Sequence, residues 1–244
     1  LWTHLIPATI EGRAIHNVQN AMFAAALAYN LAIGLEDVRH GLRTFDSTFF
    51  QAPGRMNIYD EHPFKVILDY AHNPAAVKAM CSLTDRFDVD GRRIAVISAP
   101  GDRRDEDIRS IAEMSAGHFD YYICGCDDNR RGRGPDEVAV MLKNRLLECD
   151  VDASQIEVIP DEQEATLRAL EMAVTGDLVL ILGDNVKRSW KQIIYFNSEA
   201  KGEAMPQKST MTIELPDAGD FAFDDDVEII SDERGVRIAR EEGD

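Results

Sequence analysis

The residues best suited to chemistry follow short apolar runs, and the first such group lies at residues 69–74. This segment reads D-Y-A-H-N-P, so a carboxylate at Asp69 and an imidazole at His72 are three residues apart. Asn73 suits a helix N-cap and Pro74 suits the first helical position, where free backbone N–H groups attract anions. Asp69 and His72 could contact a ribose, a cation or a phosphate there. The alternative is a capped helix whose histidine has only a structural partner.

Two later segments carry charges of both signs after an apolar run. Residues 101–107 read G-D-R-R-D-E-D, and residues 127–134 read D-D-N-R-R-G-R-G. Gly101 permits a tight backbone, and Arg103 and Arg104 can form paired hydrogen bonds with a carboxylate or phosphate. Each segment alone is also typical of a solvated loop. Three such segments in succession favour a shared binding site.

The elements that must position these segments alternate between short strands and helices. We predict strands at residues 64–69, 93–98, 120–124, 155–159 and 177–182. Helices are predicted at residues 74–86, 104–117, 135–148, 162–174 and 187–194. This alternation predicts a doubly wound α/β domain with a mainly parallel sheet, to which residues 55–59 would add an antiparallel edge. Ligands bind at the carboxyl ends of such strands, where the three charged segments fall.

The chain before this domain is predicted to be helical. Residues 16–33 place apolar side chains on one helical face, at Val18, Met22, Ala25 and Tyr29. A second helix is predicted at residues 36–45, and residues 51–55, Q-A-P-G-R, are predicted to form a turn or linker.

The charge of the chain changes near Asn197. The 244 residues carry a formal net charge of −18, and residues 197–244 hold 14 acidic and 5 basic side chains, half of that excess. Residues 211–215 and 227–230 could be short strands, and this tail could form a small hairpin or stay partly disordered. The acidity argues against a nucleic-acid-binding surface.

Other features of the composition exclude further classes. No run of 18 apolar residues exists, so we predict no membrane span, and no signal peptide is recognisable. The four cysteines lack a paired C-x-x-C spacing, which favours buried thiols over a metal site. We therefore expect a cytoplasmic protein without a metal site of its own.

Four motifs, in order along the chain, resemble those of the Mur ligase family. H-N-V-Q-N-A at 16–21 resembles a signature near the end of the family's central ATPase domain, and P-G-R at 53–55 resembles its linker arginine. D-Y-A-H-N-P at 69–74 and G-D-R-R-D at 101–105 resemble two motifs of the C-terminal domain. The resemblance covers residues 10–196. It divides the chain into residues 1–52, the helical end of the ATPase domain; 53–196, the C-terminal α/β domain; and 197–244, an acidic extension.

The resemblance implies an ATP-dependent ligase that activates a carboxylate as an acyl phosphate, which an amine then attacks. It implies ATP and Mg²⁺ as cofactors, with magnesium ligands mostly outside this chain. The implied nucleotide contacts are His16, Asn17, Asn20, Arg55 and Asp69. The implied amino-acid contacts are His72, Asn73, Asp102, Arg103 and Arg104. The implied catalytic residues are Arg55, Asp69 and His72.

Longer matches, including D-R-R-D-E-D-I at 102–108, are most similar to the branch of the family that adds arginine to the β-carboxylate of aspartate in a polymer. That branch implies arginine and an aspartate-containing polymer as substrates, and a homo-oligomer. An arginine substrate would suit the acidic residues Asp105, Asp107, Asp127 and Asp128.

Two alternatives remain open. One is another ligase of the family, acting on peptidoglycan precursors or on folylpolyglutamate, and the other is a non-catalytic binding module. The chain starts at Leu1 and contains no G-x-x-x-x-G-K-[ST] phosphate loop. We therefore expect it to be part of a larger ligase and to be inactive alone.

Overall fold

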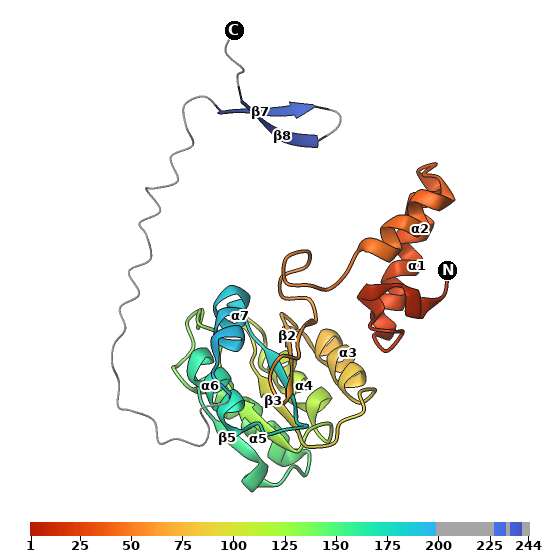
Figure 1. Ribbon diagram of the computed structural model, residues 1–244. Helices are drawn as coiled ribbons and strands as arrows, with labels where there is room; N and C mark the ends of the chain where they lie inside the picture. Colours follow the sequence, from red (N-terminus) through yellow and green to blue (C-terminus); the bar gives the residue numbers. More distant parts are fainter. Residues whose placement is uncertain (199–226, 233–234, 241–244) are drawn as a thin grey trace. The chain divides into compact units, whose positions relative to one another are not determined.

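The computed structural model describes residues 1–198 in full, together with the backbone of residues 227–232 and 235–240 (Figure 1). The chain divides into two compact units, Leu1–Gly202 and Glu203–Asp244. In the second unit, β7 (Val227–Asp232) pairs antiparallel with β8 (Gly235–Arg240). The strand predicted at 227–230 is confirmed and β8 was not predicted. The strand predicted at 211–215 lies outside the described residues.

A six-stranded sheet forms the centre of the first unit. Its strands are β1 (Asn57–Tyr59), β2 (Lys65–Asp69), β3 (Arg93–Ile97), β4 (Tyr121–Cys124), β5 (Ile156–Val158) and β6 (Leu178–Leu182). Their order is β1-β2-β6-β3-β4-β5, and β1 runs antiparallel to β2 while each other pairing is parallel. The predicted doubly wound α/β fold is confirmed, including its antiparallel edge.

Helices cover both faces of this sheet (Figure 1). They are α3 (Pro74–Thr84), α4 (Asp105–Ser115), α5 (Glu137–Glu148), α6 (Glu162–Met172) and α7 (Val186–Tyr195). Side chains of α3, α4 and α5 pack with Ile67 and Leu180 on one face. Side chains of α6 and α7 pack with Leu68 and Ile181 on the other. Because consecutive strand residues point to opposite faces, both-sided burial explains why β6 is apolar throughout and why β2 and β3 are apolar between their ends.

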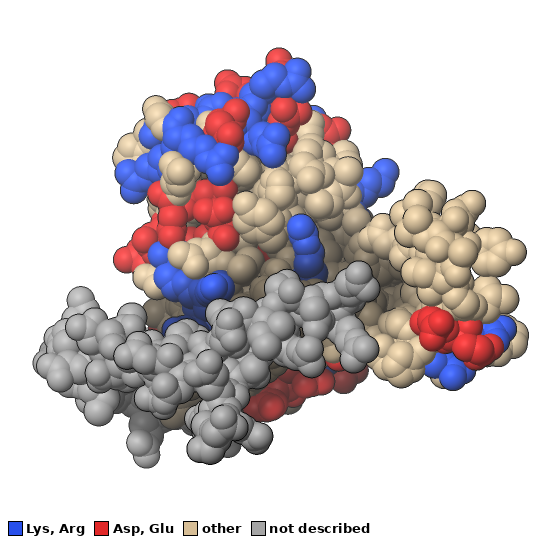
Figure 2. All heavy atoms as spheres, turned by 90° about the horizontal axis from the view of Figure 1, so that it is seen from above, with Lys and Arg blue, Asp and Glu red and all other residues tan. Residues whose placement is uncertain are grey.

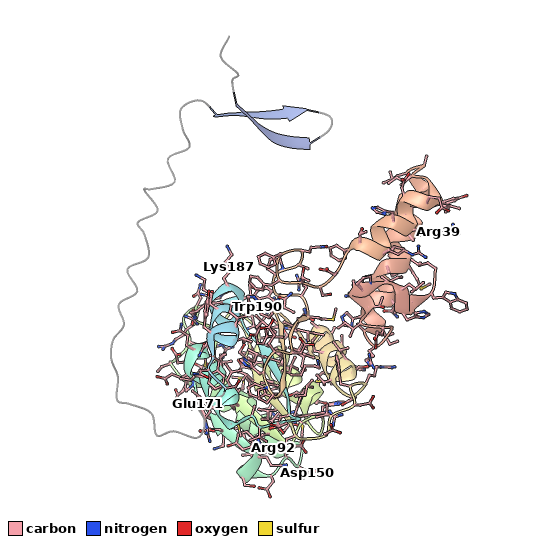
Figure 3. The ribbon with its side chains drawn as sticks, viewed as in Figure 1. Arg39, Arg92, Asp150, Glu171, Lys187 and Trp190 are labelled. Atoms are coloured by element: carbon pink, nitrogen blue, oxygen red, sulfur yellow. The ribbon has the colours of Figure 1, made fainter. Side chains whose placement is uncertain are left out.

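Asp177 secures the amino edge of the sheet, just before β6. Its buried carboxylate accepts hydrogen bonds from the Arg92 backbone N at 2.7 Å, the Arg92 guanidinium at 2.7 Å and the Val174 backbone N at 3.0 Å. Burial by itself would raise the pKa of Asp177, but the hydrogen bonds from Arg92 outweigh it and the pKa is lowered. Arg92 lies toward the opposite end of the α/β body from Trp190 and Lys187 of α7 (Figure 3).

The N-terminal part contains α1 (Ile15–Asn30) and α2 (Leu35–Thr44), preceded by 3₁₀ turns at Thr3–Leu5 and Pro7–Thr9. Both predicted helices are confirmed. The apolar face of α1 is largely uncovered, since Met22 is 67% exposed and Tyr29 is 65% exposed. No helix among the described residues is long and apolar enough to cross a membrane.

Leu180 provides a test of the core, because it is fully buried on the central strand β6. We expect Leu180→Ala to lower the free energy of unfolding by about 2–5 kcal/mol, since it loses buried apolar area and leaves a cavity. Urea unfolding of the 244-residue chain measures this loss. Leu167→Ala, at a position 40% exposed on α6, is the control and should change stability by about 0.5 kcal/mol or less. Equal losses for the two variants would contradict the described packing.

Candidate active site

The end of β2 joins the sheet to the linker that carries Arg55. Asp69 is the last residue of β2 and is only 6% exposed. Its Oδ2 accepts a hydrogen bond from the Met56 backbone N at 2.8 Å. Burial raises the pKa of Asp69 to about 6, against the lowering effects of this hydrogen bond and of the Arg55 and His72 charges. Asp69, Arg55 and His72, predicted separately, are thus close enough to interact electrostatically.

Gly54 fixes the path of the linker just before Arg55. Its carbonyl accepts a hydrogen bond from the Tyr70 backbone N at 2.9 Å. Its φ is +71°, and an added Cβ would lie 2.7 Å from a methyl group of Val186 at the start of α7. Glycine adopts this conformation without strain and leaves room for the close approach. The P-G-R sequence therefore places Arg55 beside the ends of β2 and the start of α7.

His72 and Asn73 lie in the turn between β2 and α3. The His72 Nδ1 is 2.8 Å from the Tyr70 carbonyl oxygen, and the two rings are 4.6 Å apart. The Asn73 Oδ1 accepts a hydrogen bond from the Ala76 backbone N at 2.9 Å. The predicted cap with Pro74 at the first helical position is confirmed. Because the cap uses the side-chain oxygen of Asn73, a contact with substrate would come from its amide nitrogen.

The N-terminal motif contributes to a cavity of about 550 Å³ between α1, α2 and the linker. Asn17, Asn20 and Arg55 line it together with small and apolar side chains of both helices. The Asn17 Nδ2 donates to the Ala8 carbonyl at 2.7 Å, and the Asn20 Nδ2 donates to the Asn17 Oδ1 at 3.0 Å. His16 does not line this cavity. Its Nε2 is 3.1 Å from the Met56 sulfur, and burial lowers its pKa, which favours the neutral ring.

The loops after β3 and β4 are bound to each other by arginines. Arg131 forms an ion pair with Asp102 at 2.5 Å. Arg133 donates to the carbonyls of Gly101 and Arg103, each at 2.8 Å. The backbone of the second loop approaches Gly101 so closely that an added Cβ would lie 2.2 Å from a carbonyl oxygen. The two segments predicted to share a site are therefore in contact.

Arg104, predicted as a substrate contact, forms hydrogen bonds of 3.0 Å with Asp107 at the start of α4. Figure 2 shows basic and acidic side chains intermingled over part of the α/β body, whereas the helical part near the N-terminus is mostly uncharged in that view. In the loops after β3 and β4, arginines and aspartates form ion pairs with one another.

A buried acidic cluster lies where β3, β4 and β6 end. Asp127 follows β4, is 6% exposed, and accepts a hydrogen bond from the Ser98 hydroxyl at 3.0 Å. Burial, together with the nearby charges of Asp184 and Glu162, raises the pKa of Asp127 to about 6, against the lowering effects of the Ser98 hydrogen bond and the Arg131 charge. Glu162 accepts hydrogen bonds from the Asp184 backbone N at 2.9 Å and the Ser189 hydroxyl at 2.7 Å. Arg188 lies 3.8 Å from Glu162, and the charge of Arg131 offsets part of that of Asp127. A cationic ligand would offset the remaining negative charge.

Sequence reasoning missed Ser98, Glu162 and Asp184 as parts of this cluster. Asp184 follows β6 in the segment Gly183–Asn185, which has no run of charges. Asp184 joins the cluster because of the strand order. β6 lies between β2 and β3, so the residue after β6 lies near the ends of β3 and β4. The signal in the sequence was the end of the fifth predicted strand, where the same rule on ligand sites applies.

Asp127 offers a test of this electrostatic arrangement through stability. Its folded pKa of about 6 exceeds the ordinary value of 3.8, so the folded state holds the proton more tightly and loses stability as pH rises from about 4 to 6. Asp127→Asn removes that loss and keeps an acceptor for Ser98. We expect the variant to be more stable than the wild type at pH 7 by on the order of 1–2 kcal/mol, and the difference to shrink toward pH 4.

Urea unfolding at pH 4.5 and pH 7 measures the effect. Asp136→Asn is the matched control, because Asp136 is exposed in the same loop. A stability difference for Asp127→Asn that does not change with pH would contradict the raised pKa.

Comparisons with known proteins identify the family to which this chain is similar. The model of the Mur ligase glutamate ligase domain matches residues 54–185. The cyanophycin synthetase of Nostoc sp. (strain PCC 7120) is 36% identical over 218 residues, which are 87% of this chain and 24% of that protein. The UDP-N-acetylmuramoyl-L-alanyl-D-glutamate–2,6-diaminopimelate ligase of Corynebacterium efficiens is 34% identical, covering 73% of this chain and 33% of that protein.

Solved structures agree with the sequence relatives. E. coli FolC in complex with ADP, without folate substrate, has a TM-score of 0.52 and 25% identity, covering 69% of this chain and 38% of that one. This chain spans about a quarter of the length of the cyanophycin synthetases that it matches. The ordered motifs, the doubly wound sheet and the match over residues 54–185 together show that the chain belongs to the Mur ligase family.

Proposed function

We propose that this chain supplies the α/β side of the active site of an ATP-dependent ligase that joins arginine to the β-carboxylate of aspartate in a polymer. The observation that carries the proposal is the cavity that brings Asn17, Asn20 and Arg55 together, with Arg55 beside the Asp69 carboxylate. The similarity to cyanophycin synthetases over 87% of the chain supports the choice of substrates.

The cavity fits a nucleotide. Its small apolar side chains suit the face of a base, and the amides of Asn17 and Asn20 suit a base's polar edge. Arg55 would meet the phosphates, since a guanidinium pairs well with phosphate oxygens. The E. coli relative of similar fold was solved with ADP.

No group of three or more His, Cys, Asp or Glu side chains suited to a metal ion occurs in the described part of the chain. The resemblance implies Mg²⁺ for the complete reaction, but we assign it no ligand and no step among these residues.

The cluster at Asp127 and Asp184 would receive the side chain of the incoming amino acid. A guanidinium would form ion pairs with these carboxylates and neutralise their negative charge. The similarity to a 2,6-diaminopimelate ligase favours a second candidate, an amino acid whose side chain ends in an ammonium group and a carboxylate. The intermingled arginines and aspartates of the two loops are compatible with that substrate as well.

The reaction of such a ligase concentrates negative charge, because the carboxylate to be activated and the triphosphate are both anionic. Arg55 would stabilise the charge that develops between them, and its fixed backbone removes the need to reorganise at that moment. The predicted contacts on the amino-acid side remain His72, Asn73, Asp102, Arg103 and Arg104. Closure of the site would exclude water that could otherwise compete with the amine.

The uncovered face of α1 supports the proposed domain division. Exposed apolar side chains there include Met22, Phe23, Leu27 and Tyr29. A patch of this kind marks an interaction surface, and this chain spans only about a quarter of its relatives. We propose that residues 1–52 belong to an ATPase domain whose remainder, in the same polypeptide, covers this face. Residues 53–196 would then be the ligase C-terminal domain and residues 197–244 an extension, with a homo-oligomer as the working assembly.

Arg55 provides the main test of the function. The complete polypeptide that carries this chain should release phosphate from ATP when given arginine and an aspartate polymer. We expect Arg55→Ala to lower kcat/KM by about 10²–10³-fold, since it removes a cation directed at the developing charge. Arg109→Ala, which removes an exposed arginine paired with Glu148 on the body, is the control and should leave activity unchanged. Full activity in Arg55→Ala would contradict the proposal, and dependence on diaminopimelate instead of arginine would favour the second candidate.

The exposed face of α1 gives a separate test of the domain division. The 244-residue chain should bind a hydrophobic fluorescent dye, and Phe23→Glu should reduce that binding because Phe23 is 70% exposed. Urea unfolding checks that the variant keeps the stability of the wild type. In the complete polypeptide the same substitution should destabilise the protein, since the side chain would then be buried. An unchanged stability there would contradict a covering domain.

A further inference from the structure

Asn57, the first residue of β1, holds the segment of chain that carries Arg55. Its side chain is fully buried. The Oδ1 accepts a hydrogen bond from the Gly54 backbone N at 2.7 Å. The Nδ2 donates to the carbonyls of Ser47 at 2.8 Å and Ala52 at 2.9 Å. One amide group thus joins three points of the preceding loop to the edge of the sheet.

The backbone on both sides of Arg55 is attached to the α/β body. Before it, the Gly54 carbonyl accepts from the Tyr70 backbone N, and after it, the Met56 backbone N donates to Asp69. The Arg55 backbone N itself donates to the Ala52 carbonyl at 3.1 Å. The side chain of Arg55 is exposed on this attached backbone. Its position therefore depends on how firmly the loop is held.

The other end of the loop is also attached to the body. The ring of Phe49 stacks on Trp190 of α7, with centroids 5.0 Å apart and an angle of 1° between planes. The Thr48 backbone N donates to the Asp46 Oδ1, and the Asp46 backbone N donates to the Gln51 side chain. We call residues 46–57 the strap, since they form one folded segment along the body.

We propose that Asn57 is a positioning residue for Arg55, and that the strap moves with the α/β body when the ligase closes. The inference rests on the proposed role of Arg55. The strap is hydrogen-bonded to the start of the sheet through Asn57 and packs on α7 through Phe49, so it would move together with the α/β body. Arg55 would then reach the nucleotide as a rigid part of the body, with little loss of conformational freedom on closure.

An asparagine is well suited to this position because it combines one acceptor with two donors. An aspartate would place a buried carboxylate against the carbonyls of Ser47 and Ala52. An alanine would leave three backbone groups without their partner, and the loop would open to recover hydrogen bonds with water.

Hydrogen exchange on the 244-residue chain tests the attachment. In Asn57→Ala we expect the amides of Gly54 and Met56 to exchange at least about tenfold faster, because local opening of the strap exposes them. Asp177→Ala is the matched control, since it also removes three hydrogen bonds from a buried side chain, but at the amino edge. Unchanged exchange at Gly54 and Met56 in Asn57→Ala would overturn the proposal. If that variant does not fold, Asn57→Ser, which can keep an acceptor for Gly54, replaces it with an intermediate effect expected.

A double-mutant cycle in the complete polypeptide tests the connection to Arg55. We expect Asn57→Ala to lower kcat/KM for ATP by about 10–100-fold, while KM for the amino acid stays within about twofold. In the Arg55→Ala background the same substitution should cause no further loss, because the group that it positions is gone. The Asp177→Ala control should have equal effects in both backgrounds.

Each outcome of the cycle has one meaning. Equal losses from Asn57→Ala with and without Arg55 would show a general effect on the fold and overturn the positioning role. Full activity in Arg55→Ala would overturn the proposed function itself. A loss from Asn57→Ala that disappears in the Arg55→Ala background supports the inference.

Discussion

The hydrogen bond from the Met56 backbone to the Asp69 carboxylate joins the linker that carries Arg55 to the end of β2. Asp69 ends a strand that is buried on both faces, so its position is set by the sheet. Met56 follows Arg55 in the chain, so the same hydrogen bond also fixes the position of the linker relative to the carboxyl end of β2. The carboxylate is buried at a cost, which its raised pKa expresses, and its partners on the linker offset part of that cost. The relation of Arg55 to the sheet depends on this contact.

The acidic cluster at the ends of β3, β4 and β6 also contains a buried carboxylate, but there fewer partners offset the cost of burial. Asp127 is buried beside Asp184 and Glu162, and the hydrogen bond from Ser98 offsets only part of the repulsion among them. Natural proteins retain such unfavourable groups where a ligand or a reaction uses them. Here the cluster lies beside loops that are cross-linked by Arg131 and Arg133. The buried charge of Asp127 thus lowers stability at this cluster, and the ion pairs hold the neighbouring loops together.

The chain contains two kinds of surface, the charged loops at the strand ends and the apolar face of α1. The loops at the strand ends are charged and mutually paired, as expected of a site that meets solvent and small ligands. The face of α1 is apolar and exposed, with Phe23 and Leu27 both about two-thirds exposed or more. Such a face gains free energy when another part of the protein covers it. The small-residue face of the same helix, with Asn17 and Asn20, instead lines the cavity.

Local periodicity in the sequence determined most elements of this protein. The strands of the sheet, the helices between them, the antiparallel edge and the cap at Asn73 were predictable, because each depends on residues a few positions apart. The motifs also placed Asp69 and His72 at the end of one strand and Arg55 in the linker before it. The helix at residues 16–33 was predicted, but its exposed face was not, since periodicity shows which side chains share a face and not what covers it.

The strand order was decided by the tertiary structure alone. Placing β6 between β2 and β3 brings Asp184 next to Asp127, although 57 residues of chain separate them. Burial of Asn57 and the stack of Phe49 on Trp190 likewise join residues that are distant or ordinary in the sequence. Hydrogen bonds and buried charges depend on three-dimensional neighbours. The sequence by itself therefore determined which chemical groups stand at the strand ends, and only the packed sheet decided which of them face one another.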